Sequence, residues 1–149
     1  MVTVVVRTDY SDNVAWRRVR AALDNTGPTF VIEGPEWDGA TVDEVLEASA
    51  PHAVLAVVFI ADAQTMSSAE YPLLAVASIT PDHDDYEETI WNGRDFRTLP
   101  RASHEIHRGL ELLTDAFASL ASVAHSHPGV VFRGRQFSGR GPAGAKPSA

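Results

Sequence analysis

The longest apolar stretch of the chain covers Ala53–Asp62 and reads AVLAVVFIAD, closing on the aspartate. A strand with one exposed face alternates apolar and polar residues, so an unbroken run with β-branched residues indicates a strand buried on both faces. A buried helix is the alternative interpretation, but Pro51 and the β-branched content favour the strand. Such a strand needs cover on both sides, and the segments before it look like helices that supply it.

The residues before this stretch switch between strand-like and helix-like patterns. β-branched runs predict strands, and apolar residues at helical spacing, such as Trp16, Val19 and Leu23, predict a helix with these residues in the core. The predicted elements are a strand over Val2–Thr8, a helix over Asp12–Asn25 capped by Ser11 or Asp12, a strand over Thr29–Glu33, and a second helix that starts at a Thr41/Glu44 capping box and ends before Pro51. The chain therefore starts β-α-β-α-β.

The second half of the chain shows shorter patterns. They predict a helical turn or lid over Ala63–Glu70, a strand over Leu73–Thr80, and one or two short strands around an Asn92-Gly93 turn within Tyr86–Leu99. A short helix is predicted over Pro100–His107, and an edge strand over Gly129–Arg133. Between them, the pattern predicts an amphipathic helix that is capped by Thr114 or Asp115 and has Phe117, Leu120 and Val123 on one side. We expect a single α/β domain over residues 1–137, with a central sheet flanked by helices and a C-terminal amphipathic helix. A Gly/Pro/Ala-rich composition predicts a disordered tail over residues 138–149.

Charge and composition narrow the classes of partner. The chain of 149 residues has 20 acidic and 12 basic residues, a net charge of −8, which argues against non-specific nucleic-acid binding because phosphates require Lys and Arg. It has no cysteine, which excludes disulfides and zinc–thiolate sites. No apolar run has the length of a membrane span, and the apolar start MVTVVVRTDY is too short for a signal peptide. We expect a soluble cytoplasmic protein that binds a protein partner or a small molecule.

Histidines provide the most obvious candidate for a metal site. His104 and His107 stand in the sequence HEIH, which lacks the HExxH spacing of zinc proteases, and His125 and His127 flank a serine. Nothing in the sequence brings the two pairs together. The sequence therefore predicts no metal site, and the absence of a Walker or GxGxxG motif predicts no cofactor.

Acid–base chemistry is the remaining catalytic option, because the chain lacks a GxSxG nucleophile motif. Asp62 closes the central strand, and Glu105 and His107 are available as proton donors and acceptors. Under this hypothesis the protein is a small cofactor-independent enzyme, such as an isomerase, cyclase or hydrolase of a biosynthetic pathway.

A binding rim is the other candidate feature. Asp9 lies at a strand end, and Trp37 lies in a loop rich in turn residues, where it could stack on a ligand. Arg133 lies beside the large apolar residues Val131 and Phe132, so we predict that it pairs with a carboxylate. By elimination, the leading hypothesis is a non-catalytic binding or regulatory module that presents an acidic surface to a protein partner, for example as an inhibitor or immunity-like protein.

Short motifs along the chain also resemble a known family. They are Arg7-Thr8-Asp9-Tyr10-Ser11-Asp12 with Trp16, Trp37-Asp38-Gly39 before Thr41-Val42, Asp62 with Thr65, Glu70-Tyr71-Pro72-Leu73, and Val131-Phe132-Arg133-Gly134. In their order and spacing over Val4–Gly134 they resemble the actinobacterial domain of unknown function 6924 family. The resemblance implies one domain and no known activity.

Overall fold

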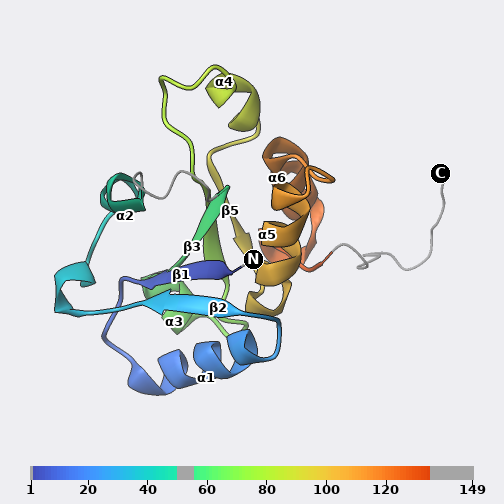
Figure 1. Cartoon of the computed structure of the whole chain (residues 1–149). Coiled ribbons are helices and arrows are strands. Elements are labelled where there is room, and N and C mark those ends of the chain that lie inside the picture. Colours follow the sequence, from blue (N-terminus) through green and yellow to red (C-terminus); the bar gives the residue numbers. More distant parts are fainter. Residues whose placement is uncertain (1, 50–55, 135–149) are drawn as a thin grey trace, which may run out of the picture.

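A six-stranded mixed sheet forms the centre of the protein, with strand order β2-β1-β3-β4-β5-β6 (Figure 1). The computed structural model describes residues 2–49 and 56–134. The strands are β1 (Thr3–Arg7), β2 (Thr29–Ile32), β3 (Val57–Ala61), β4 (Leu73–Ala77), β5 (Asp95–Thr98) and β6 (Val131–Phe132). The helices are α1 (Asn13–Asp24), α2 (Val42–Ser49), α3 (Ala63–Ser67), α4 (Tyr86–Thr89), α5 (Ser103–Glu111) and α6 (Phe117–Ser126), with short 3-10 turns at Pro35–Trp37, Pro100–Ala102 and Pro128–Val130.

The strand pairing confirms the predicted α/β fold and its β-α-β-α-β start. β1 is parallel to both β2 and β3, β4 is antiparallel to β3 and β5, and β6 is parallel to β5. The carboxyl ends of all strands except β4 therefore lie at one end of the sheet, which we call the carboxyl-end edge, and the opposite end is the amino-end edge. The predicted tail over residues 138–149 lies outside the described residues.

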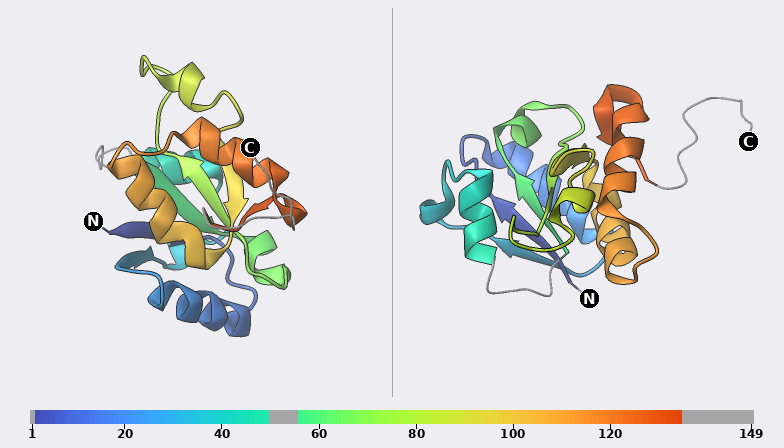
Figure 2. Two further views of the ribbon diagram at one scale, coloured as in Figure 1. Left: turned by 90° about the vertical axis from the view of Figure 1, so that its right-hand side faces the viewer. Right: turned by 90° about the horizontal axis from the view of Figure 1, so that it is seen from above.

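β3 is buried on both faces, as its apolar run predicts. Val57, Phe59 and Ala61 belong to the larger core, whereas Val58 and Ile60 belong to the smaller one. α1, α3, α5 and α6 pack on the first face, and α2 covers the second. Figure 2 shows this layering, with the teal helix α2 on one side of the sheet and the orange helix α6 on the other. Residues 53–55 of the apolar run are not among the described residues.

Two predicted helix starts are confirmed in detail. Asp12 caps α1 and accepts the backbone N–H of Ala15 at 2.9 Å. Before α2, the Thr41 backbone N–H donates to Glu44 at 2.8 Å and the Glu44 N–H donates to the Thr41 hydroxyl at 3.1 Å, which completes the capping box.

The predicted cap and face of α6 were partly wrong. α6 begins after Ala116 without a side-chain cap, because the N–H groups of Thr114 and Asp115 bond back to the Gly109 carbonyl and close α5 instead. Phe117 and Leu120 are buried as predicted, but Val123 is 39% exposed. The small side chains of Ala121 and Ala124 take its place against the sheet.

Of the one or two short strands predicted within Tyr86–Leu99, the structure contains one. Tyr86–Thr89 is the helical turn α4, and only β5 follows as a strand. Asn92 makes a tertiary contact instead of a hairpin turn, because its side-chain amide donates to the Ala118 carbonyl of α6 at 2.9 Å. The segment that contains α4 consequently extends beyond the sheet (Figure 1).

Candidate functional site

The strand order of the sheet reverses at the carboxyl-end edge. The chain runs from β1 outward to β2 and then crosses back to β3, so the strand order reverses between the carboxyl ends of β1 and β3. Open α/β sheets usually bind ligands at such a reversal. Thr8 and Asp9 follow β1 here, and Asp62 follows β3.

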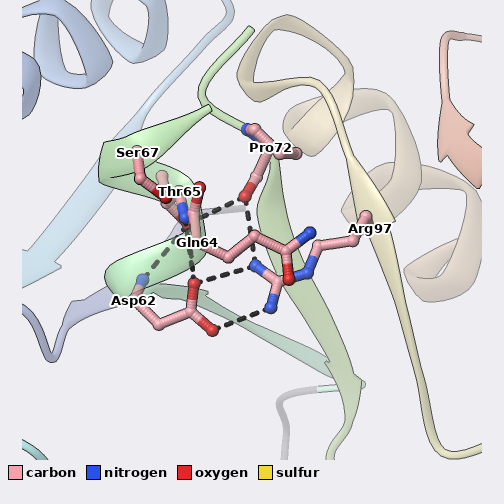
Figure 3. A network of polar contacts seen from close by, with 6 residues as sticks. All are labelled: Asp62, Gln64, Thr65, Ser67, Pro72 and Arg97. Carbon is pink, nitrogen blue, oxygen red and sulfur yellow. Dashed lines mark hydrogen bonds and ion pairs between the residues drawn. The ribbon is translucent and has the colours of Figure 1, made fainter. Parts of the chain in front are cut away.

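Asp62 holds two elements together at this edge. Its carboxylate accepts the Thr65 N–H, and the Thr65 hydroxyl accepts the Asp62 N–H, each at 3.1 Å, which caps α3. Both carboxylate oxygens also accept hydrogen bonds from Arg97 at 2.8 Å (Figure 3). Arg97 extends from β5 across β4 and also donates to the Pro72 carbonyl at 3.3 Å. The network thus ties β5 to the start of α3.

These contacts decide what chemistry Asp62 can perform. Burial alone would raise the pKa of Asp62, but the hydrogen bonds and charge of Arg97, together with the Thr65 donors, hold this pKa below its ordinary value. A general base works best with a pKa near the operating pH. In this arrangement Asp62 is a fixed anion with both oxygens engaged, which suits structure better than proton transfer.

Arg7 is a buried cation at the end of β1, with 4% of its surface exposed. Charge-assisted hydrogen bonds and aromatic rings surround its guanidinium, which is how a folded protein accommodates a buried charge. Its contacts are the Asp9 carbonyl at 2.9 Å, Asn13 at 3.0 Å, Glu33 at 3.6 Å, and the centres of the Tyr10 and Trp16 rings at 4.2 and 5.0 Å. The RTDYSD motif is therefore a structural unit around one arginine.

The predicted pairing of Arg133 with a carboxylate is confirmed. Nη1 and Nη2 each donate to Glu70 at 2.8 Å, and Nε donates to the Pro128 carbonyl at 3.1 Å. The hydrogen bonds to Arg133 lower the pKa of Glu70. This bidentate pair connects the residue after β6 to the loop before β4.

Replacing Arg133 with alanine is expected to lower the free energy of unfolding by about 1 kcal/mol, because the Glu70 side chain is 53% exposed and water replaces the lost contact. Urea denaturation of the wild type, both single variants and the Arg133→Ala/Glu70→Ala double variant measures this. The double variant should lose less than the sum of the single losses. If the stability of Arg133→Ala is unchanged while binding or turnover disappears, Arg133 belongs to a functional site.

The three predicted rim residues do not form one rim. Asp9 accepts the Ser11 hydroxyl at 2.7 Å next to β1. Trp37 is half-buried against the smaller core, and Gly39 nearby uses its left-handed backbone, with φ +76°, to donate its N–H to the Thr8 carbonyl. Arg133 follows β6, four strand positions from β1, or about 19 Å at ordinary strand spacing.

The proposed acid–base residues are also separated. Glu105 and His107 are two positions apart on α5, and side chains at that spacing face different sides of a helix. His107 is 2% exposed, with Nε2 3.5 Å from Glu111 and, within the described part of the chain, no hydrogen-bond partner on Nδ1. The hydrogen bonds of Asp62 go to Arg97 and Thr65 and not to either α5 residue. The three side chains therefore lack the mutual geometry of a catalytic group.

His107 predicts a specific pH dependence. Burial lowers its pKa below the usual 6.5, and Glu111 opposes this shift only in part. As the pH falls below about 6.5, the unfolded chain takes up a proton that the folded protein does not, so stability decreases. We expect the melting temperature of the wild type to fall over this range and that of His107→Leu to fall less. His125→Ala, which removes an exposed histidine, is the control and should behave like the wild type.

The histidines make separate contacts. His104 lies 3.3 Å from the Thr3 hydroxyl, and Nδ1 of His127 accepts the backbone N–H of Arg133 at 3.0 Å. Within residues 2–49 and 56–134, no three His, Asp or Glu side chains are grouped so that they could hold a metal ion. The prediction that the protein binds no metal remains to be tested by elemental analysis.

The amino-end edge contains a feature that the sequence analysis missed, an open cavity of about 850 Å³. The segment that contains α4 forms one wall, and the turn between α5 and α6 forms the other. Its apolar lining includes Ile79, Leu110, Leu113 and Phe117, and its rim includes Asp85 and Glu88. We call it the α4 groove. The sequence did contain one signal of this groove, the pair Leu112-Leu113 directly after a helix. Two exposed leucines at a helix end are unusual.

Exposed carboxylates gather on the same side of the molecule. Leu46 of α2 also lines the groove, and Arg94 beside α4 donates to Asp43 of α2 at 2.8 Å, so these two segments are neighbours. We call this surface the acidic face. Its carboxylates are Asp43, Glu44, Glu47, Asp82, Asp84, Asp85, Glu87 and Glu88, all of them exposed. The paired arginines Arg7, Arg97 and Arg133 lie at the opposite edge.

Comparison with known proteins places the chain in a family. No curated protein matches the sequence. No helix within the described part of the chain has the length and apolar character needed to cross a membrane. The family model described as "Domain of unknown function (DUF6924)" matches residues 2–135. The match spans the sheet and every motif noted above, so the chain belongs to the domain of unknown function 6924 family.

Proposed function

We propose that this protein is a non-catalytic binding module that presents its acidic face to a basic protein partner. The observation that carries the proposal is the uneven distribution of charge. Arg7, Arg97 and Arg133 at the carboxyl-end edge are matched by Glu33, Asp62 and Glu70. Among the residues that the structure describes, the other carboxylates of the acidic face have no such cation, and Asp43 alone pairs with one, Arg94.

Charge of this kind supports recognition rather than folding. Exposed carboxylates that lie close together repel one another, so they do not stabilise the protein by themselves. Opposite charge on a partner relieves this repulsion and speeds association. A basic protein, such as a toxin with a cationic active site, has the matching chemistry for an inhibitor or immunity-like role.

The enzymatic alternative has weaker support. It relies on Asp62, Glu105 and His107, but Arg97 engages the Asp62 carboxylate and the His107 side chain is buried. A feature in its favour is Nδ1 of His107, which has no hydrogen-bond partner among the residues that the structure describes. A buried imidazole without a route to substrate does not by itself provide catalysis.

Partner capture with matched variants tests the proposal. The acidic-face variant carries Asp84→Asn, Glu87→Gln and Glu88→Gln, and the control carries Asp24→Asn, Glu36→Gln and Asp38→Asn, which remove the same charge elsewhere. We expect wild type and control to retain a basic protein from extracts of the source organism that the acidic-face variant loses. With the purified partner, calorimetry should show roughly tenfold weaker binding, about 1.4 kcal/mol. Equal retention by all three proteins would contradict the proposal.

The cellular setting belongs to the same proposal. The family resemblance suggests an actinobacterial source, and we propose a cytoplasmic location. Fractionation of the source cells, with detection of the protein by antibody, tests the location.

A further inference from the structure

The α4 groove combines an apolar floor with a charged rim. Phe117 is 5% exposed and Leu110 is 8% exposed, so they form a firm base. Asp85 and Glu88 of the α4 segment stand at the rim. An apolar base beside carboxylates matches a ligand with one apolar face and one basic face.

Leu113 at the other lip is unusual in two independent ways. It is 87% exposed, the highest value among the large apolar residues of the described chain. Its backbone is in the left-handed region, with φ +58°, where helix ends usually place Gly or Asn. A leucine at this position lowers the stability of the fold in two ways, through exposure of its side chain and through backbone strain. Residues that are unfavourable for stability are often kept because they serve the function.

We infer that the α4 groove receives one amphipathic helix of the partner protein, with its apolar side chains on Ile79, Leu110 and Phe117 and its basic side chains toward Asp85 and Glu88. This inference rests on the proposed function, because it specifies which structure of the basic partner the acidic face recognises. Helices that dock in grooves use apolar anchors at positions i, i+3, i+4 and i+7. Leu113 would cover the apolar side of the docked helix.

Charge distinguishes the partner helix from a second copy of this chain. A second copy would bring its own acidic face, and the protein carries a net charge of −8, so two copies repel each other at this surface. A helix with Lys and Arg on its polar side meets the opposite charge.

The test uses a labelled 14-residue peptide of leucine and lysine, with leucines at helical spacing, and a control peptide of the same composition in which leucine and lysine alternate. Fluorescence anisotropy with the full chain is measured in about 0.15 M salt, where the screening length is about 8 Å. We expect the helical peptide to bind and the alternating peptide to bind at least tenfold more weakly. No binding of the helical peptide at 1 mM protein, or equal binding of both peptides, would overturn the inference.

Leu112/Leu113 and Glu87/Glu88 are neighbouring pairs in which only the second residue lines the groove, so each pair provides a variant and its matched control. Leu113→Asn should weaken binding roughly tenfold, since a leucine contact is removed, whereas Leu112→Asn, outside the groove lining, should change it less than twofold. Leu113→Asn should keep or raise the melting temperature, because Asn tolerates the left-handed backbone. Glu88→Gln should weaken binding more than Glu87→Gln, since only Glu88 is at the rim. Equal effects within either pair would overturn the inference.

If the α4 groove binds the chain's own tail or a second copy instead of a partner helix, the experiments give different results. Residues 135–149 contain Arg135, Arg140 and Lys146 and no acidic residue. If Arg140→Gln/Lys146→Gln raises peptide affinity tenfold, the chain's own tail occupies the groove, and if sedimentation shows a dimer that Leu113→Asn dissociates, a second copy does. Either result overturns the inference. If the partner captured through the acidic face binds Leu113→Asn as well as wild type, the groove inference fails while the proposed function stands.

Discussion

Replacing Arg7 with alanine is expected to lower the free energy of unfolding by about 3 kcal/mol. The substitution removes two hydrogen bonds, to the Asp9 carbonyl and to Asn13, and leaves a gap between the Tyr10 and Trp16 rings. Urea denaturation followed by circular dichroism measures the loss. Tryptophan fluorescence is unsuitable, because Trp16 itself contacts the guanidinium.

Arg20→Ala is the matched control for this prediction. Arg20 contacts the same Glu33 at 3.4 Å, but its side chain is 42% exposed, whereas that of Arg7 is 5% exposed. An exposed pair contributes at most about 1 kcal/mol. Equal, small losses in the two variants would show that burial of the Arg7 guanidinium contributes little.

Asp62→Ala is expected to cost about 3 kcal/mol. The loss has two parts, about 1 kcal/mol for the cap of α3 and about 2 kcal/mol for an Arg97 guanidinium left without its carboxylate. Asp62→Asn should cost less, since asparagine still caps a helix. The same urea experiment measures both variants.

Asp12→Ala provides the comparison, because Asp12 caps α1 and forms no ion pair with an arginine of the described residues. We expect a loss of about 1 kcal/mol there. A loss in Asp62→Ala no larger than that in Asp12→Ala would show that Arg97 contributes nothing to stability. If Asp62→Ala instead kept the fold and abolished a catalytic turnover, the enzymatic alternative would become the leading function.

Local patterns predicted much of the fold. The unbroken run at β3, the Thr41/Glu44 capping box and the β-branched first strand depend on residues close together in the sequence, so one sequence carries enough information to find them. Whether one or two strands surround Asn92-Gly93 could not be decided from the sequence, because the Asn92 side chain is used in a contact with α6 that neighbouring residues do not encode. The burial of Val123 was predicted wrongly, since Ala121 and Ala124 are the residues of α6 that are buried beside Phe117 and Leu120.

The candidate sites were harder to predict, because their partners are distant in the sequence. Asp62 was identified from its position after β3, but Arg97, its partner 35 residues away, was not. The residue types of Asp62, Glu105 and His107 suited catalysis, whereas only the structure shows that Arg97 engages Asp62 and that His107 is buried. The α4 groove has walls from three parts of the chain, which no single motif could reveal.

The position of β6 has a consequence for how the protein is made. Val131 and Phe132 pair with Arg97 and Thr98, so the outer edge of β5 stays uncovered until nearly all of the described chain has been synthesised. The Phe132 ring, 6.2 Å from the Phe96 ring, arrives equally late. An open strand edge can pair with another chain. Nascent chains halted between β5 and β6 should therefore be aggregation-prone, and the two-residue strand completes the sheet only in the last moments of translation of this domain.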